Sequence, residues 1–189
     1  MTKLLRWSLA GTLLAAMLAV APSAHAKKLK TEDELIEEMS SPKEKIAVHA
    51  MLEYEKTYPT STKAFPVIKK NLKDSRTAVR RKAARVLGSL HAEVSKEELK
   101  DIAALMKSTD KMEATDGLKA LRGLRAKPVI PEIVAALEYP DDGVKRDACR
   151  TLAVVADKSV IPKIEPLLQF PSPKVQKDAM DAINTLKMK

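Results

Sequence analysis

The sequence predicts an all-α fold, a solenoid of about five stacked helical hairpins. Three pairs of apolar residues share the same offset of 31 residues: Val144/Val175, Ala148/Ala179 and Leu152/Ile183. The first positions of the five expected second helices are spaced by 35, 34, 31 and 31 residues: Glu44, Val79, Glu113, Val144 and Val175. A repeat period of this length is typical of proteins whose units bury their apolar faces only against neighbouring units.

The first 26 residues have the pattern of a secretory signal peptide. Lys3 and Arg6 are followed by an uncharged, largely apolar run over Trp7–Val20 and by the small-x-small sequence Ala24–Ala26. We therefore predict cleavage after residue 26, a mature chain that begins at Lys27, and a periplasmic or secreted location.

The alternative for this segment is an uncleaved membrane anchor, because the uncharged stretch Trp7–Ala26 approaches the roughly 20 residues that span a bilayer. Pro22, Ser23 and the small residues after them favour cleavage. No cysteine follows the cleavage site directly, so the sequence does not indicate a lipid anchor.

The formal net charge is +9, and loss of Lys3 and Arg6 with the signal peptide would lower it to +7. This excess is spread among many acidic residues and predicts solubility with a weak attraction for anions. Cys149 is the single cysteine, so no intramolecular disulfide can form. We expect the apolar core alone to stabilise the mature chain.

The first hairpin begins after a short basic leader, residues 27–30. Thr31–Glu34 fits a capping box, in which the threonine hydroxyl and the glutamate carboxylate bind each other's free backbone N–H groups. A helix should follow through Met39. Pro42 then restarts the helical pattern, and a second helix should run from Glu44.

The later hairpins follow from the same periodicity. Residues 59–62 form a turn, and Ala64–Leu72 reads as a short helix. The repeat is fullest at Val79, Ala83, Leu87 and Leu90, whose steps of four, four and three residues line one face of a helix. The predicted hairpins are residues 31–57, 63–90, 95–124, 128–156 and 159–189.

Prolines support these boundaries. Pro140 and Pro171 mark the bends inside two successive hairpins, whereas Pro131 and Pro162 lie in the first turns of two leading helices. Pro166 falls too far into its helix for this explanation, so we expect it to kink that helix.

Two sets of residues are expected to form the core. Leu87, Leu121, Leu152 and Ile183 should make a continuous apolar row through the stack. Small residues, Ala83, Ala148 and Ala179, recur where two helices must approach closely. A larger side chain at these alanines would overpack the interface, at a cost of roughly 1–3 kcal/mol.

The pattern resembles the HEAT-repeat family, in particular the short bacterial HEAT-like units. The residues that carry the resemblance are Val79-Arg80 with Ala83, Leu87 and Gly88, and Asp141, Val144-Lys145, Ala148 and Leu152 with Val160-Ile161-Pro162. The resemblance covers nearly the whole mature chain and implies a right-handed α-solenoid whose second helices line the concave surface. It is specific for fold and says little about the ligand.

Two copies depart from the pattern. The third copy has Glu113 where valine is expected and Gly117 where alanine is expected. The first copy, at Glu44, departs further, as an end unit exposed to water often does.

A basic stripe is the strongest candidate for a binding surface. Arg85, Lys119 and Arg150 each lie six residues after the first position of their second helix, and Arg81 and Arg146 flank two of them. The family resemblance would place all five on the concave face, with Lys145 beside them. We therefore predict that these five residues contact a partner.

The alternative for the stripe is a solvated face without a ligand. Stacked helices lie about 8–10 Å apart, and two like charges at about 10 Å in water repel by only ~0.4 kcal/mol before screening. A basic stripe is therefore almost free of energetic cost. Recurring aspartates could also neutralise it: Asp116, Asp147 and Asp178.

The sequence predicts neither a metal site nor a cofactor. His49 and His91 are 42 residues apart and neither lies beside a second ligand, which disfavours zinc. Asp141-Asp142 lacks the spacing of a calcium loop and is better explained as the start of a turn. Cys149 is expected to be a buried packing residue; a nucleophilic role would need a nearby base.

These observations favour an exported, non-enzymatic scaffold or adaptor that binds a protein, or another anionic partner, through the concave face. One alternative is a HEAT-like enzyme of the DNA glycosylase or bilin lyase type. Export and the scarcity of aromatic residues for base stacking disfavour a nucleic-acid substrate. Another is a peripheral binder of anionic lipid or of an envelope polymer, which would use the same basic face.

Overall fold

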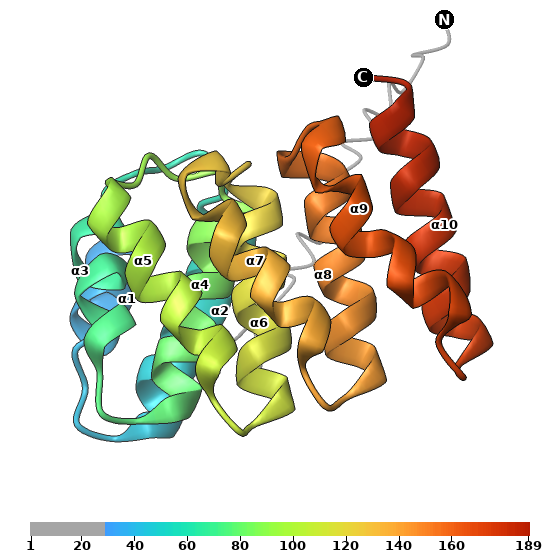
Figure 1. Cartoon of the computed structure of the whole chain (residues 1–189). Helices are drawn as coiled ribbons and strands as arrows, with labels where there is room; N and C mark the ends of the chain where they lie inside the picture. Colours follow the sequence, from blue (N-terminus) through green and yellow to red (C-terminus); the bar gives the residue numbers. More distant parts are fainter. Residues whose placement is uncertain (1–28) are drawn as a thin grey trace, which may run out of the picture.

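The computed structural model describes residues 29–189, which form ten α-helices, six 3-10 helices and no strand (Figure 1). The first helices of the five hairpins are α1 (Glu32–Glu38), α3 (Phe65–Lys70), α5 (Lys96–Ala104), α7 (Ile130–Ala135) and α9 (Ile161–Ile164). The second helices are α2 (Glu44–Thr57), α4 (Thr77–Ser89), α6 (Lys111–Gly123), α8 (Asp142–Val155) and α10 (Pro173–Lys187). The predicted all-α solenoid of about five hairpins is confirmed.

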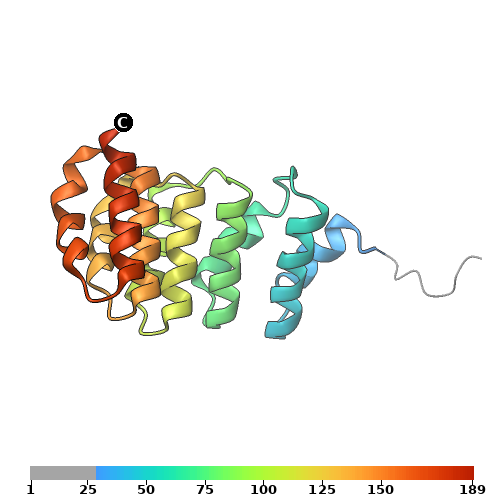
Figure 2. The ribbon, with the colours of Figure 1, turned by 90° about the vertical axis from the view of Figure 1, so that its right-hand side faces the viewer.

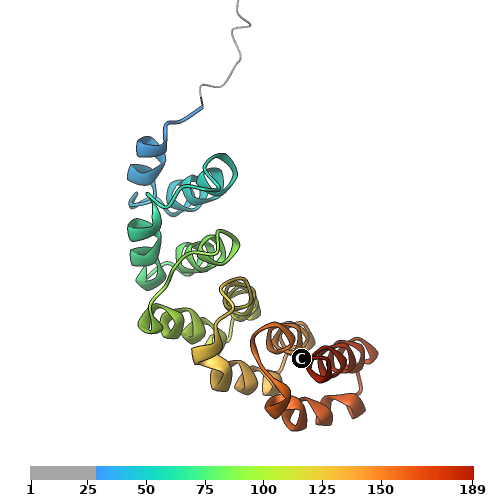
Figure 3. The same cartoon turned by 90° about the horizontal axis from the view of Figure 1, so that it is seen from above.

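The hairpins follow one another along an arc (Figure 3). The first helices lie on its outer side, and the second helices lie side by side along its inner side (Figures 2 and 3). The second helices therefore form the concave face.

The predicted signal peptide, residues 1–26, and the first two residues of the leader lie outside the described residues. From residue 29 onwards, no helix combines the length and apolar character needed to cross a bilayer.

Side-chain caps fix the beginnings of several helices. The predicted capping box is confirmed: the Glu34 backbone N–H donates to Thr31 Oγ1 at 3.3 Å, and the Thr31 N–H donates to the Glu34 carboxylate at 2.7 Å. Asp141 caps α8 by accepting from the N–H groups of Gly143 and Val144 at 2.8 and 3.3 Å. Asp141 and Asp142, predicted to begin a turn, are instead the N-cap and the first residue of a helix.

The first helices of the later hairpins end in tighter 3-10 turns: η1 (Asn71–Lys73), η2 (Leu105–Lys107), η4 (Ala136–Glu138) and η6 (Glu165–Gln169). In the last hairpin the change comes earliest, after only four α-helical residues. Pro166 lies at the start of η6, and its missing N–H cannot continue the α-helical ladder. The helix predicted to be kinked at Pro166 therefore changes type there, from α to 3-10.

The predicted core is confirmed. Leu87, Leu121 and Leu152 are fully buried, Ile183 is 3% exposed, and the alanines of the close-approach positions are fully buried as well: Ala83, Ala148 and Ala179. Because these residues lie on successive second helices, the core is continuous along the arc.

The helices α4 and α6 meet almost backbone to backbone. A Cβ atom added to Gly88 would lie 2.6 Å from Ala120 Cα, and one added to Gly123 would lie 2.3 Å from the Gly88 carbonyl oxygen. Only glycine fits at these two positions, which explains Gly88 at the end of the fullest repeat.

The departures in the third copy have specific partners. Glu113 is 4% exposed and accepts from Arg80 Nη2 at 2.8 Å, so the charge at a valine position is neutralised by the preceding hairpin. A Cβ atom on Gly117 would lie 3.1 Å from Leu105 Cβ and 3.2 Å from the Ile102 carbonyl oxygen. The first helix of this hairpin thus packs unusually close at residue 117.

Candidate functional site

All five residues of the predicted basic stripe lie on α4, α6 and α8, which line the concave face: Arg81, Arg85, Lys119, Arg146 and Arg150. Arg85, Lys119 and Arg150 are exposed, whereas Arg81 and Arg146 are half-buried. Two further cations, Lys82 and Arg122, lie on the same helices.

The half-buried arginines join successive hairpins. Arg81 Nε donates to Asp116 Oδ2 at 2.8 Å, and Arg146 Nε donates to Asp178 Oδ2 at 2.6 Å. In both pairs an arginine of one second helix binds an aspartate of the next. The side chains of Asp116 and Asp178 are less than a tenth exposed, so each pair is partly shielded from water.

The exposed arginines form ion pairs with the same two carboxylates. Arg85 Nη1 lies 3.8 Å from Asp116 Oδ1, whereas Arg150 Nη2 lies 3.0 Å from Asp178 Oδ2. Arg150 also lies 3.8 Å from Asp147. The recurring aspartates, predicted as possible counter-ions of the basic stripe, therefore do form ion pairs with its arginines.

The offset is uneven along the arc. On α8 and α10, Arg146 and Arg150 are matched by Asp147 and Asp178. The helices α4 and α6 carry five cations of this face, of which Arg81 and Arg85 form ion pairs with Asp116. The other three are Lys82, Lys119 and Arg122. Of these, Arg122 also reaches Asp147 at 3.6 Å, and no ion pair forms at Lys119 or Lys82 within residues 29–189. The positive charge of the concave face is therefore concentrated on α4 and α6.

Lys82 causes much of this asymmetry. It stands three residues after the first position of its helix, where the next three second helices have aspartate. Burial lowers its pKa below the ordinary value for lysine, and the neighbouring Arg85 lowers it further, although Glu55 and Asp116 attract the ammonium group from a distance. The predicted stripe does not include Lys82, although a position-by-position comparison of the repeat copies shows lysine in place of aspartate here.

Lys145 does not belong to this surface, and its placement beside the stripe in the sequence analysis is wrong. It is 6% exposed, its Nζ donates to the Leu137 carbonyl oxygen at 2.9 Å, and it lies 5.0 Å from the centroid of the Phe170 ring. Arg80, at the same place in α4, donates to the carbonyl oxygens of Asp74 and Ser75, both at 2.9 Å. A cation here binds the end of the first helix, where carbonyl groups lack helical partners.

Cys149 is a buried, free thiol, as predicted. Burial, together with the nearby Asp178 carboxylate, raises its pKa to about 12. A thiol of this kind stays protonated at neutral pH and does not act as a nucleophile.

Both histidines of residues 29–189, His49 and His91, have structural partners. His91 ends α4 with φ 49°, a left-handed conformation, and its Nδ1 lies 2.9 Å from the Gly123 carbonyl oxygen. His49 Nε2 lies 3.3 Å from Glu53 on the same helix. Among residues 29–189, no group of three or more His, Cys, Asp or Glu side chains is placed to hold a metal ion.

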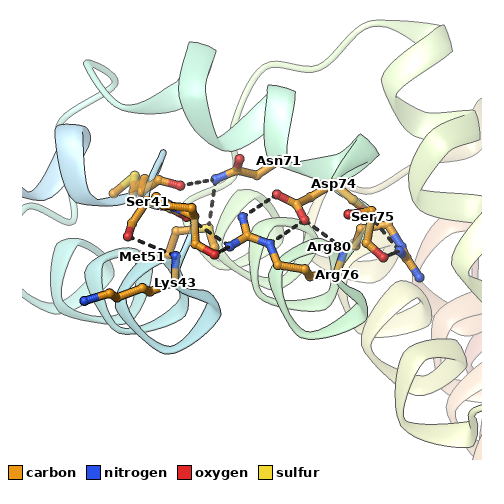
Figure 4. Close-up of polar contacts among 10 residues, drawn as sticks. Ser41, Lys43, Met51, Asn71, Asp74, Ser75, Arg76 and Arg80 are labelled. Carbon is orange, nitrogen blue, oxygen red and sulfur yellow. Dashed lines mark hydrogen bonds and ion pairs between the residues drawn. The ribbon is translucent and has the colours of Figure 1, made fainter.

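A second polar cluster joins the first two hairpins on an edge of the solenoid (Figure 4). Arg76 binds Asp74 through two contacts of 2.8 and 2.6 Å, and its Nη1 donates to the carbonyl oxygens of Ser41 and Pro42, both at 2.9 Å. The buried Asn71 donates to the Met39 carbonyl oxygen at 3.0 Å. These groups satisfy one another, so the cluster is structural.

Comparisons with known proteins identify the fold. No protein-family model matches the sequence, and no curated protein matches it. The complex of CpcE and CpcF of phycocyanin lyase from a Nostoc species is similar in structure, with a TM-score of 0.73 and 19% identity over 88% of this chain and 69% of that chain.

Designed armadillo repeat proteins are also similar. One has a TM-score of 0.56 at 16% identity, and another, in complex with the peptide (KR)4, has a TM-score of 0.62 at 12% identity; each match covers 80% of both chains. At these identities the likeness shows the fold, a solenoid of helical repeats.

Proposed function

We propose that the protein is an exported, non-enzymatic scaffold that binds an acidic segment of a partner protein on its concave face. The observation that carries this proposal is the excess of cations on α4 and α6, where Arg81 and Arg85 share the single carboxylate of Asp116 and Lys119 lines the neighbouring depression. Electrostatic complementarity with an acidic partner would guide association and fix its register.

The structural neighbours support a binding role in general terms. One is a complex of two chains, and another holds a peptide. The peptide (KR)4 in that complex is basic. In the present protein it is the binding surface, the concave face, that is basic. By the same electrostatic logic, the segment bound here should be acidic.

A crosslinking pull-down from the native envelope fraction, followed by mass spectrometry, would identify the partner. We expect the triple variant Arg85→Glu, Lys119→Glu, Arg150→Glu to lose the crosslinked partner, because the reversed charges would repel an acidic segment. A variant of equal charge change on exposed lysines of the outer helices, Lys70→Glu, Lys100→Glu, Lys163→Glu, should retain it. Full retention by the concave variant, with an unchanged melting temperature, would contradict the proposal.

A lyase-like activity is the second candidate, because of the similarity to the CpcE–CpcF complex. Incubation of the protein with a free bilin, followed by absorption spectroscopy, separates the two functions. A scaffold leaves the bilin spectrum unchanged. A spectral shift that disappears in Arg85→Glu would favour the enzyme.

Export rests on the amino-terminal sequence alone, with Lys3, Arg6 and the small residues before Lys27. Amino-terminal sequencing of the protein recovered from the native envelope should give a chain that begins at Lys27. An intact amino terminus in the cytoplasmic fraction would contradict export and favour the enzyme.

A further inference from the structure

Two depressions indent the concave face, one on each side of Arg85. The first lies between α2 and α4, has a volume of about 190 Å³, and is lined by Val48, Lys82 and Asp116 among others. The second lies between α4 and α6, has a volume of about 400 Å³, and is lined by Lys119 and Arg122. Arg85 contributes to both.

The first depression lies where the internal ion pairing of the repeat is interrupted. At two interfaces of the stack an arginine two residues after the first position binds the aspartate of the next helix, Arg81–Asp116 and Arg146–Asp178. Between α2 and α4 the corresponding residues are Ile46 and Lys82. The aspartate of this position is thus replaced by a cation, and within residues 29–189 Lys82 forms no ion pair. A carboxylate from another molecule could serve as its counter-ion.

The second depression has the same sign of charge. Lys119, Arg122 and Arg85 surround it, and the nearest carboxylates, Asp116 and Asp147, are 3.8 and 3.6 Å from the arginine nitrogens. The ends of α4 and α6 point into it, and helix carboxyl termini disfavour anions by about 0.3–1 kcal/mol. His91 offsets part of this unfavourable helix-end potential, because its Nδ1 lies 2.9 Å from the Gly123 carbonyl oxygen at the end of α6.

We propose that these two depressions form a bipartite site for an extended acidic peptide, which places one carboxylate beside Lys82 and a second beside Lys119 and Arg122. This inference rests on the proposed function and names the residues and the spacing that the partner must satisfy. Lys82 and Lys119 lie on adjacent second helices, and the axes of packed helices are about 8–10 Å apart. In a polyproline II segment, side chains three residues apart lie on the same side, separated by about 9 Å.

The extent of the charge favours a short peptide over a long polyanion. A nucleic acid or an anionic polymer gains affinity from a long row of unpaired cations. Here the row ends at α6, because Arg146 and Arg150 are bound to Asp178 on the following helices.

The test uses fluorescence anisotropy with the purified protein and labelled peptides of equal net charge. We expect a peptide with two glutamates three positions apart to bind about tenfold more tightly than peptides with adjacent glutamates or with glutamates six positions apart. Lys82→Gln and Lys119→Gln should each weaken binding about tenfold. Lys174→Gln, at an exposed lysine of α10 outside both depressions, is the matched control and should leave it unchanged.

Several outcomes would overturn the inference. Equal affinity for all glutamate spacings would exclude a bipartite site, and failure of every acidic peptide to bind would exclude the site itself. Full competition by inorganic phosphate at equal charge concentration would reduce it to a general anion site. Melting temperatures equal to that of the wild type establish that the variants are folded.

The two proposals can fail separately. If the crosslinked partner is lost on reversal of Arg150 but not on substitution of Lys82 or Lys119, the bipartite site is wrong and the concave scaffold stands. If the partner is retained in all of these variants, the scaffold proposal fails as well.

Discussion

Arg80 stabilises its own hairpin and the next one at the same time. Its guanidinium group donates to two carbonyl oxygens at the end of the first helix, Asp74 and Ser75, and to the buried carboxylate of Glu113. The glutamate looks like a defect in the repeat when the sequence is considered alone. In the structure it is the partner of a cation 33 residues earlier.

Replacement of Glu113 by valine, the residue typical of this repeat position, should therefore destabilise the protein. Glu113→Val should lower the free energy of unfolding by about 1–3 kcal/mol, because a half-buried guanidinium loses its carboxylate. Urea unfolding followed by circular dichroism measures the change. The double variant Arg80→Met, Glu113→Val should lose less than the sum of the two single variants; strict additivity would show that the pair contributes nothing.

At the scale of helices, the closest contact in the stack is the one between α4 and α6. Gly88 and Gly123 allow two backbones to meet, and this approach brings Arg85, Lys119 and Arg122 around one depression. The packing requirement and the charge cluster are thus parts of the same interface.

Gly88→Ala should separate α4 from α6. The added Cβ would lie 2.6 Å from Ala120 Cα, and backbone cannot yield as a flexible side chain can. We expect a loss of about 3 kcal/mol in the free energy of unfolding, at the upper end of overpacking costs, measured by urea denaturation. Gly143→Ala is the control, because its Cβ would meet only the movable Asp141 carboxylate at 2.9 Å. Equal losses in the two variants would contradict the tight contact.

The contact between the first two hairpins should depend on pH. Arg76 holds the pKa of Asp74 below its ordinary value of 3.8, although burial opposes the shift. On acidification the unfolded chain therefore takes up this proton before the folded chain does. The stabilisation is complete above the unfolded value and disappears as the pH falls through the folded value.

Asp74→Asn tests this dependence. The variant should lose about 1–2 kcal/mol at pH 7, because a charge-assisted pair becomes a neutral contact. Below pH 3 the difference from the wild type should shrink. Thermal melts across the acid range measure both effects; a difference that stays constant with pH would show that Asp74 carries no linked proton.

At the scale of the whole molecule, the solenoid has no central core, and each hairpin is stabilised by its neighbours. The apolar row of Leu87, Leu121, Leu152 and Ile183 passes through four hairpins. Damage at one interface should therefore affect the coupling between the two ends of the stack.

Leu152→Ala should cost about 2–5 kcal/mol, because the leucine is fully buried and its removal leaves a cavity. It should also lower the dependence of stability on denaturant, as the last two hairpins begin to unfold apart from the first three. Equilibrium urea unfolding reports both quantities. Val154→Ala, on the same helix but 43% exposed, should behave nearly as the wild type.

The sequence by itself determined the repeat, the capping box at Thr31, the burial of the leucine row and the helical positions of the basic stripe. These features follow from local periodicity and from contacts within a few residues, so they can be predicted from one amino-acid sequence. The tertiary structure alone decided which cations remain available. Arg81, Arg146 and Arg150 bind carboxylates 28 to 35 residues away, and Lys145 donates to a buried carbonyl oxygen. Lys82 and Lys119, by contrast, form no ion pair with any residue in the described range 29–189. Such pairings depend on how neighbouring hairpins stack, because that stacking sets which charged side chains come within a few ångströms of each other.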